Sequence, residues 1–177
     1  MSTNQLNRIA AITRLLGLSG RKLGRTAVMK LCFFLQSIKD VPLGYEFTLY
    51  SYGPFDSDVL ADLQTAENLG VISSDIEYYV GGYGYEISPT ARAKEVEAVS
   101  DDFLGKYSSE IEWVANTFSS LSATDLELLS TIVFISQKRV ILSDTALIAQ
   151  VHQVKPHFST DRIAEKIAWL KKINVMK

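Results

Sequence analysis

Hydrophobic residues recur at helical spacing in two segments at the start of the chain. In residues 4–16 apolar side chains fall at every third or fourth position, and Gly17 and Gly20 then interrupt the pattern. Residues 25–39 carry a second apolar stripe, which includes Cys32. The pattern therefore predicts two helices, and it places Cys32 in the hydrophobic core.

The pattern then changes to short β-rich segments on either side of a third helix. Residues 46–52 (EFTLYSY) predict a strand, and residues 76–88 (IEYYVGGYGYEIS) predict a hairpin around a glycine turn. Between them we expect a helix that begins after Pro54, with Asp56 or the next residue as its N-cap and Gly70 as its left-handed end. The expected buried face of this helix consists of Val59, Leu60, Leu63 and Ala66.

After about Ser100 the periodicity is wholly helical. Ser122, Ser143 and Ser159 stand where they would cap the apolar segments that follow them. No flexible linker separates this part from what precedes it. We interpret the chain as α+β and mostly helical. A winged-helix-like lobe with a β-hairpin wing would occupy residues 1–99, and a small helical lobe packed on it would occupy residues 100–177, with one continuous domain as the alternative.

Charge is unevenly distributed, although the net charge is only −2. Residues 1–39 contain seven basic residues and no acidic one, whereas residues 40–112 contain fifteen acidic and three basic residues. A basic segment can bind nucleic acid or neutralise an acidic segment folded against it, and the weakly negative total favours neutralisation. The basic residues that would contact DNA are Arg8, Arg14, Arg21, Lys22 and Arg25.

The composition is that of an ordinary globular protein of 177 residues. No apolar run approaches the ~20 residues that span a bilayer. The first twenty residues carry charges within their apolar stretch, so they do not resemble a signal peptide. The lone Cys32 fits a reducing compartment. These features predict a cytoplasmic protein that does not contact a membrane.

Residues that carry chemistry do not form a catalytic pattern in the sequence. Cys32, on an apolar helix face, would be protonated and inert. His152 and His157 are separated by Pro156, and no neighbouring acid or thiol completes a metal-ligand set. The glycines of residues 81–84 lack the Lys-Ser/Thr of a phosphate loop. We expect no enzymatic activity, metal or cofactor; a hydrolase would need a histidine to meet Cys32 or carboxylates in a cleft.

The segment that would enter a DNA groove is acidic. Residues 55–69 carry a net charge of −4, to which Asp62 contributes, and offer only Gln64 and Asn68 as base readers. The predicted hairpin, together with Asp75 just before it, adds three acidic residues and no basic one. Because both elements would repel a duplex, the shape is predicted to serve protein contact. The predicted contact residues are Tyr78, Tyr79, Tyr83, Tyr85 and Glu86.

Two sequence blocks resemble a known family. KLCFFLQ (residues 30–36) and VPLGYEFTLYSYGPFDSDVLADLQTAENLGVI (residues 41–72) are similar to the bacterial and archaeal YwgA-like proteins. In that family a Lys-Leu helix precedes a strand ending in Tyr-Gly-Pro and an apolar helix ending in Leu-Gly-x-Ile. The ending, residues 155–173, is also similar, so the resemblance covers about residues 22–174. More distantly, the helix–Tyr-Gly-Pro–helix core resembles the Panacea (SocA-like) antitoxin domain, without the Trp and longer loop common there.

The YwgA-like resemblance implies a fold, and the Panacea resemblance implies an antitoxin role. We therefore predict a protein-interaction module, an antitoxin or an accessory subunit of a bacterial toxin–antitoxin or defence system. Its partner would be a protein, a toxin or effector with a basic surface. The alternative is a winged-helix transcriptional regulator that binds DNA through the basic N-terminal helices. Tyr52, Gly53 and Pro54 are predicted to serve architecture, with Pro54 in the first turn of a helix.

Overall fold

The computed structural model describes residues 1–80, 82–138 and 143–176, and within these residues the fold is α+β and mostly helical. Two antiparallel hairpins, β1–β2 and β3–β4, make up its β structure. The elements run in the order α1 (Thr3–Leu18), α2 (Arg25–Lys39), β1 (Thr48–Tyr50), β2 (Gly53–Phe55), α3 (Ser57–Asn68), β3 (Ile72–Tyr79), β4 (Gly82–Pro89), α4 (Ala93–Val99), α5 (Asp101–Lys106), α6 (Ser108–Phe118), α7 (Ala123–Lys138), α8 (Asp144–Val154) and α9 (Thr160–Lys172).

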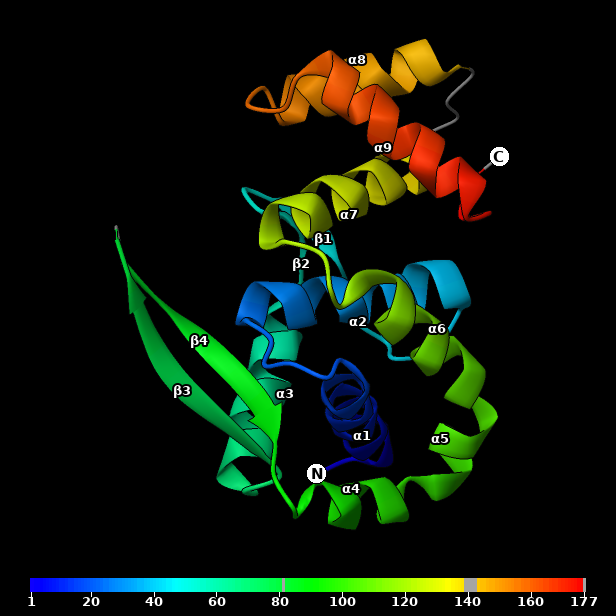
Figure 1. Cartoon of the computed structure of the whole chain (residues 1–177). Coiled ribbons are helices and arrows are strands. Elements are labelled where there is room, and N and C mark those ends of the chain that lie inside the picture. The colour runs from blue at the N-terminus through cyan, green and yellow to red at the C-terminus, as the bar shows by residue number, and fades with distance from the viewer. Residues whose placement is uncertain (81, 139–142, 177) are drawn as a thin grey trace.

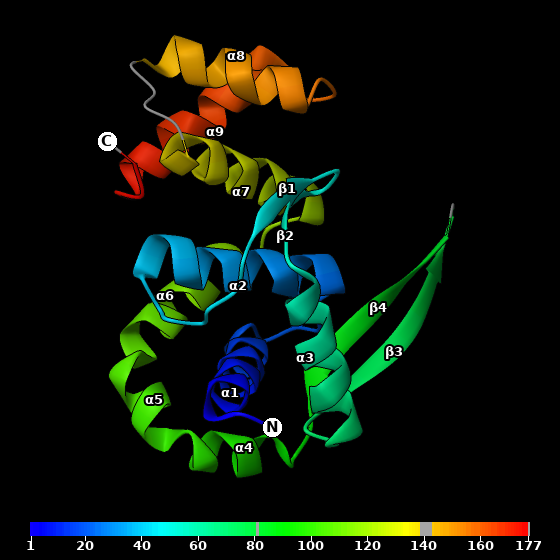
Figure 2. The ribbon, with the colours of Figure 1, turned by 180° about the vertical axis from the view of Figure 1, so that it is seen from behind.

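Helix α1 lies at the centre of one end of the molecule. Helices α2 to α6 surround it, and α1 packs directly against α3, α4, α5 and α6 (Figure 1). On the other side of α2, helices α7, α8 and α9 form a further layer. The β1–β2 hairpin lies beside α7, whereas β3–β4 projects away from the helices, as the view from behind also shows (Figure 2). We call the β3–β4 hairpin the wing.

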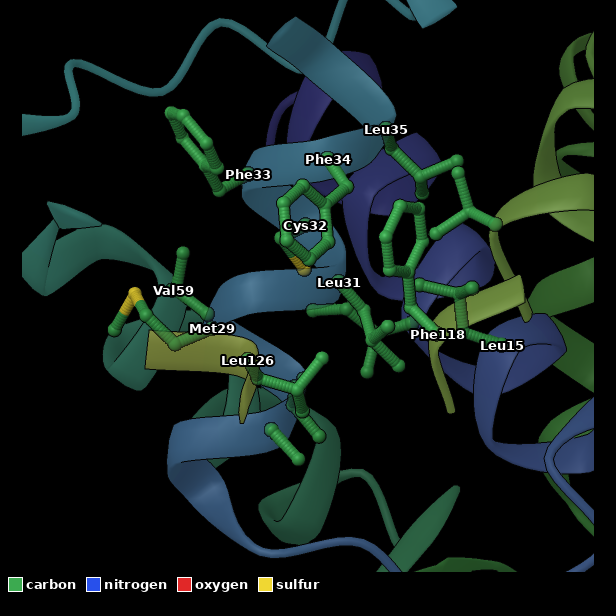
Figure 3. Packing of buried hydrophobic residues seen from close by; sticks show 14 of the residues in the cluster. Leu15, Met29, Leu31, Cys32, Phe33, Phe34, Leu35, Val59, Phe118 and Leu126 are labelled. Carbon is green, nitrogen blue, oxygen red and sulfur yellow. The ribbon is translucent and has the colours of Figure 1, made fainter. Parts of the chain in front are cut away.

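A single hydrophobic cluster extends from Ile9 to Leu170. Its centre is α2, where every residue from 27 to 35 is buried, so this helix is covered on all sides. The ring of Phe34 stacks on that of Phe118 with centroids 4.1 Å apart (Figure 3). Residues 1–99 and 100–177 therefore share a core, and a boundary between two lobes near residue 99 stays a prediction.

Most predicted helix boundaries are confirmed. The second helix spans residues 25–39, as expected. Asp56 caps α3 by accepting a hydrogen bond from the main chain of Asp58, and Gly70 follows α3 with φ of +70°. Ser143 and Ser159 cap α8 and α9. Short polar side chains that pair with free backbone N–H groups are therefore reliable start signals in this chain.

Three expectations for the segment around α3 are wrong. Pro54 lies in β2, opposite Leu49, and not in the first turn of a helix. Leu60 is 36% exposed and does not belong to the buried face. Asp62 is fully buried instead of facing solvent. It lies three residues after Val59 and therefore on the same face of the helix, which is the face that packs inward.

Asp62 tolerates burial because other elements supply its partners. Arg8 Nε lies 2.7 Å from its Oδ2, and the hydroxyl of Tyr45 donates to the same oxygen at 2.8 Å. Gln5 Nε2 donates to Oδ1 at 3.1 Å. A buried carboxylate that is paired and hydrogen-bonded avoids most of the cost of leaving water. Asp62 therefore fixes α3 to α1 and does not contribute to an acidic outer face.

Candidate functional site

The β1–β2 hairpin carries the predicted Tyr52-Gly53-Pro54 motif and packs closely on α7. Gly53 has φ of +89°, a conformation that residues with a Cβ rarely adopt. A Cβ there would lie 3.1 Å from Ser130 Oγ and 3.3 Å from the main-chain oxygen of Glu127. Tyr52, in contrast, is 71% exposed. The glycine is thus required by the backbone and by α7, while the tyrosine faces solvent.

A buried lysine from the far end of the chain holds this turn in place. Lys155, which follows α8, donates to the main-chain oxygens of Tyr50 and Ser51 and lies 2.7 Å from Glu127 Oε1 on α7. His157 Nε2 is 3.4 Å from the same carboxylate oxygen. Both members of the Lys155–Glu127 pair are buried. The pair therefore joins three segments that are far apart in sequence.

A second buried lysine lies on the other side of the turn. Lys30, on α2, is 2% exposed and donates to the main-chain oxygen of Pro54 at 2.7 Å. Among the described residues no carboxylate lies within ion-pair distance of its ammonium. Burial, with a smaller contribution from the charge of Lys155, lowers the pKa of Lys30 to about 8.

Between α2, the β1–β2 turn and α3 there is a cavity of about 410 Å³, which we call the Lys30 cavity. Its position explains why Leu60 is not buried in the core, because Leu60 faces this space. Two cationic residues and no acidic residue line it within the described part of the chain. The lining residues relevant here are Met29, Lys30, Tyr50, Tyr52, Phe55 and Leu60.

The wing has two different faces, because side chains alternate along a strand. Its register pairs Tyr78 with Tyr83 and Ile76 with Tyr85, which gives an aromatic face. The rings of Tyr78 and Tyr83 lie 6.3 Å apart, and these residues are 80% and 57% exposed. Further down, the same face continues into the buried Ile87. An apolar stripe thus runs from the core to the exposed end of the described hairpin.

The opposite face of the wing is acidic. Asp75 is paired directly with Glu86, an arrangement of like charges that is unfavourable without a counter-ion. Lys22 supplies one, since its Nζ lies 2.7 Å from Asp75 and 3.7 Å from Glu86. The adjacent Leu23 exchanges two main-chain hydrogen bonds with Ile87. The segment before α2 therefore holds the base of the wing by both charge and backbone pairing.

The predicted contact residues do not form one surface. Tyr78, Tyr83 and Tyr85 share the aromatic face, whereas Glu86 belongs to the acidic face. Tyr85 is half-buried, and the guanidinium of Arg25 covers its ring at 3.5 Å. The side chain of Tyr79, like the whole of Gly81 in the predicted turn, lies outside the described residues.

The basic N-terminal residues are engaged within the fold. Arg8 pairs with Asp62, and Arg14 Nη2 lies 3.0 Å from Glu97. Arg21 donates to the main-chain oxygens of Ser119 and Leu121. Together with Lys22 on the wing and Arg25 on Tyr85, all five candidate DNA-binding residues contact other parts of the chain. Three of the five, Arg8, Arg14 and Lys22, thus pair with carboxylates of the acidic segment.

The other residues that could carry chemistry, Cys32 and His152, have separate environments. Cys32 is buried, and burial raises the pKa of its thiol, which keeps it protonated. His152 Nδ1 lies 2.9 Å from the main-chain oxygen of Phe158. In the part of the chain that the structure describes, no three His, Cys, Asp or Glu side chains gather where they could hold a metal ion. None of its helices is both long and apolar enough to cross a membrane.

Sequence reasoning missed the two buried lysines and Glu127. Lys155 and Glu127 are separated by 28 positions, so no local pattern joins them. For Lys30 a signal exists, because residues 27–35 are apolar around nearly the whole helix and any lysine among them must be buried. A comparison of the chain with known protein-family models and with curated protein sequences finds no match.

Proposed function

We propose that this chain is a non-enzymatic protein-binding module and that the aromatic face of the wing is its contact surface. The observation that carries the proposal is the exposure of Tyr78 and Tyr83, side by side on a hairpin that projects from the helices (Figures 1 and 2). Tyrosine provides large contact area for few rotatable bonds and is enriched in the centres of interfaces.

The negative charge of the acidic face of the wing favours binding of a partner with a basic surface. Within the described residues, Lys22 pairs with Asp75 and Glu86, and Glu77 adds a third carboxylate, which leaves this face negative. Such a surface selects partners of opposite charge and accelerates their association. A toxin or effector that acts on nucleic acid would present a basic surface. We therefore propose an antitoxin, or an accessory subunit of a bacterial toxin–antitoxin or defence system, that acts in the cytoplasm.

The sequence resemblance agrees with this proposal. Relationship to the YwgA-like proteins and, more distantly, to the Panacea antitoxin domain rests on residues 30–36 and 41–72. We further propose that residues 1–99 form a winged-helix variant, in which the β1–β2 hairpin replaces the single strand before the third helix. In this interpretation the wing contacts protein and not DNA.

The DNA-binding alternative has less support. It depends on a free basic surface at the N-terminus, but Arg8 and Arg14 pair with acids and Arg25 covers Tyr85. On α3 the two candidate base readers, Gln64 and Asn68, are hydrogen-bonded to each other at 3.2 Å. A duplex approaching α3 and the wing would meet mainly carboxylates.

A hydrolytic function also has little support. His157 does meet a carboxylate, that of Glu127, but Lys155 binds the same oxygen. The hydroxyls of Ser130 and Thr131, on the same helix as Glu127, donate to its main-chain oxygen and are buried. A nucleophile needs a base within reach and access to substrate. We therefore assign this cluster to structure.

Photo-crosslinking tests the proposed surface directly. p-Benzoylphenylalanine replaces Tyr78 in the cells that make the protein, and a matched control carries it at Glu165, whose side chain is 73% exposed on α9. We expect a dominant adduct with a basic protein from position 78 only. Production of that protein alone should arrest growth, and this chain should relieve the arrest.

The rescue should depend on the aromatic face. A Tyr78→Ala/Tyr83→Ala variant with an unchanged circular dichroism spectrum should lose at least about 2 kcal/mol of binding free energy if either residue is a hot spot. The same adducts from both positions, or full rescue by the double variant, would reject the wing as the contact surface. Salt-tolerant binding of the unmodified protein to one DNA sequence would favour the regulator instead.

A further inference from the structure

The Lys30 cavity lies outside the wing, and the proposed function does not use it. Its volume of about 410 Å³ falls within the range of small-molecule sites, roughly 300 to 1,000 Å³. Met29, Phe55 and Leu60 give it apolar walls. The cavity is therefore large enough for a ligand with an apolar body.

Its charge is unbalanced. Lys30 and Lys155 are both buried beside the β1–β2 turn. The carboxylate of Glu127 lies within ion-pair distance of Lys155 but not of Lys30. Lys30 has three N–H donors, of which one reaches the main-chain oxygen of Pro54. Arg25 also lines the cavity. An anionic group bound beside Lys30 would supply the missing counter-charge, and the burial of the ammonium would strengthen that pairing.

The aromatic side chains that line the cavity favour a ligand whose uncharged part is flat. Tyr50 and Phe55 place their ring centroids 5.3 Å apart, and Tyr50 and Tyr52 are both exposed. Flat aromatic side chains favour stacking with a flat apolar group. We propose that the Lys30 cavity binds a small aromatic monocarboxylate, whose carboxylate pairs with the ammonium of Lys30 and whose ring lies among Met29, Tyr50 and Phe55.

Methionine methyl groups offer a direct readout. The chain contains three methionines, and Met29 lines the cavity whereas Met1 and Met176 are at the ends of the chain. In protein labelled with ¹³C at the methionine methyls, 1-naphthoate should shift the Met29 signal saturably and leave the Met1 signal unchanged. 1-Naphthalenemethanol, the uncharged analogue, should bind at least roughly tenfold more weakly, because it cannot pair with the ammonium.

Substitution of the lysine provides the second arm. Lys30→Met keeps an unbranched side chain of similar length and removes its charge, and Lys94→Met on the exposed face of α4 is the matched control. At pH 7, Lys30→Met should remove the preference for 1-naphthoate over the alcohol, while Lys94→Met should retain it. If the circular dichroism spectrum of Lys30→Met differs from that of the unmodified protein, the role of Lys30 is tested instead by the pH dependence of binding to the unmodified protein.

The pH arm uses the unmodified protein. The charged groups facing Lys30 are Lys155 and Glu127, with Arg25 on its own helix, and the tyrosines Tyr50 and Tyr52 lie across the cavity. Affinity for 1-naphthoate should fall as the pH rises above 8, while affinity for the alcohol stays constant. Equal binding of the two probes, the absence of a Met29 shift, or carboxylate binding that is independent of pH and of Lys30 would each overturn the proposal.

Discussion

Lys155 Nζ lies 2.7 Å from Glu127 Oε1 in the interior, and the same ammonium donates to the main-chain oxygens of Ser51 and Tyr50. The ion pair therefore fixes the β1–β2 turn to α7 and to the segment before α9. Its energy is the difference between a large electrostatic attraction and a large desolvation cost, so removing one partner is far worse than replacing both.

Lys155→Met should lower the free energy of unfolding by about 3 to 5 kcal/mol, because it leaves the Glu127 carboxylate buried without its cation. Urea denaturation measures the loss. His157→Ala removes a more exposed neighbour of the same carboxylate and should change stability by no more than about 0.5 kcal/mol. A Lys155→Met variant as stable as the unmodified protein would show that the pair does not hold the turn.

Gly53→Ala should destabilise the protein by about 2 kcal/mol, since it combines a positive φ with a Cβ only 3.1 to 3.3 Å from atoms of α7. Gly17→Ala, inside α1 with open space around its Cβ, is the matched control. That substitution should stabilise the protein by about 0.5 to 1 kcal/mol, because alanine favours helix. Thermal unfolding followed by circular dichroism compares the two, and equal melting temperatures would contradict the close packing.

The stability of the protein should depend on Lys30 at alkaline pH. The folded state lowers the pKa of Lys30 from 10.5 to about 8, so between these values the unfolded chain binds more protons and the contribution of Lys30 to stability rises with pH. Relative to Lys30→Met, the unmodified protein should gain up to about 3 kcal/mol between pH 7.5 and 10.5. Parallel pH profiles of the two proteins would show that Lys30 titrates normally.

Substitutions of Tyr85 and Tyr78 should have different effects, the first on folding stability and the second on partner binding. Tyr85→Ala removes the ring beneath the Arg25 guanidinium and should cost about 1 kcal/mol. Tyr78→Ala, at an 80% exposed position, should change stability by no more than about 0.5 kcal/mol while it weakens partner binding. Urea denaturation of both variants tests this, and a large loss at Tyr78 would assign that ring to folding.

Local signals were sufficient to predict most elements. Helix α2, the wing and the caps at Asp56, Ser143 and Ser159 follow from residue spacing and from side chains that pair with free N–H groups. The β1–β2 hairpin was only half predicted. Pro54 suggested a helix start, but its main-chain oxygen accepts from Lys30 and its neighbour Gly53 packs on α7, which keeps it in a strand.

Contacts between distant segments could not be predicted in this way. From the sequence alone, Asp62 is expected to be a solvent-exposed helix residue. Its burial depends on Arg8, Gln5 and Tyr45, which contact it only in the folded structure. The Lys155–Glu127 pair likewise depends on how α7 and the segment after α8 meet. Both cases are buried charges, whose cost is acceptable only when tertiary structure supplies the partners.

The register of the wing has a consequence for any protein that binds it. Leu23 is paired with Ile87, and Lys22 spans the Asp75–Glu86 pair at the base. A slip of one residue between the strands would exchange the two faces, so that carboxylates would stand where the tyrosines now stand. The contacts of residues 22–23 therefore fix the strand register at the base of the hairpin. That register determines which face carries the tyrosines and which face carries the carboxylates at the far end.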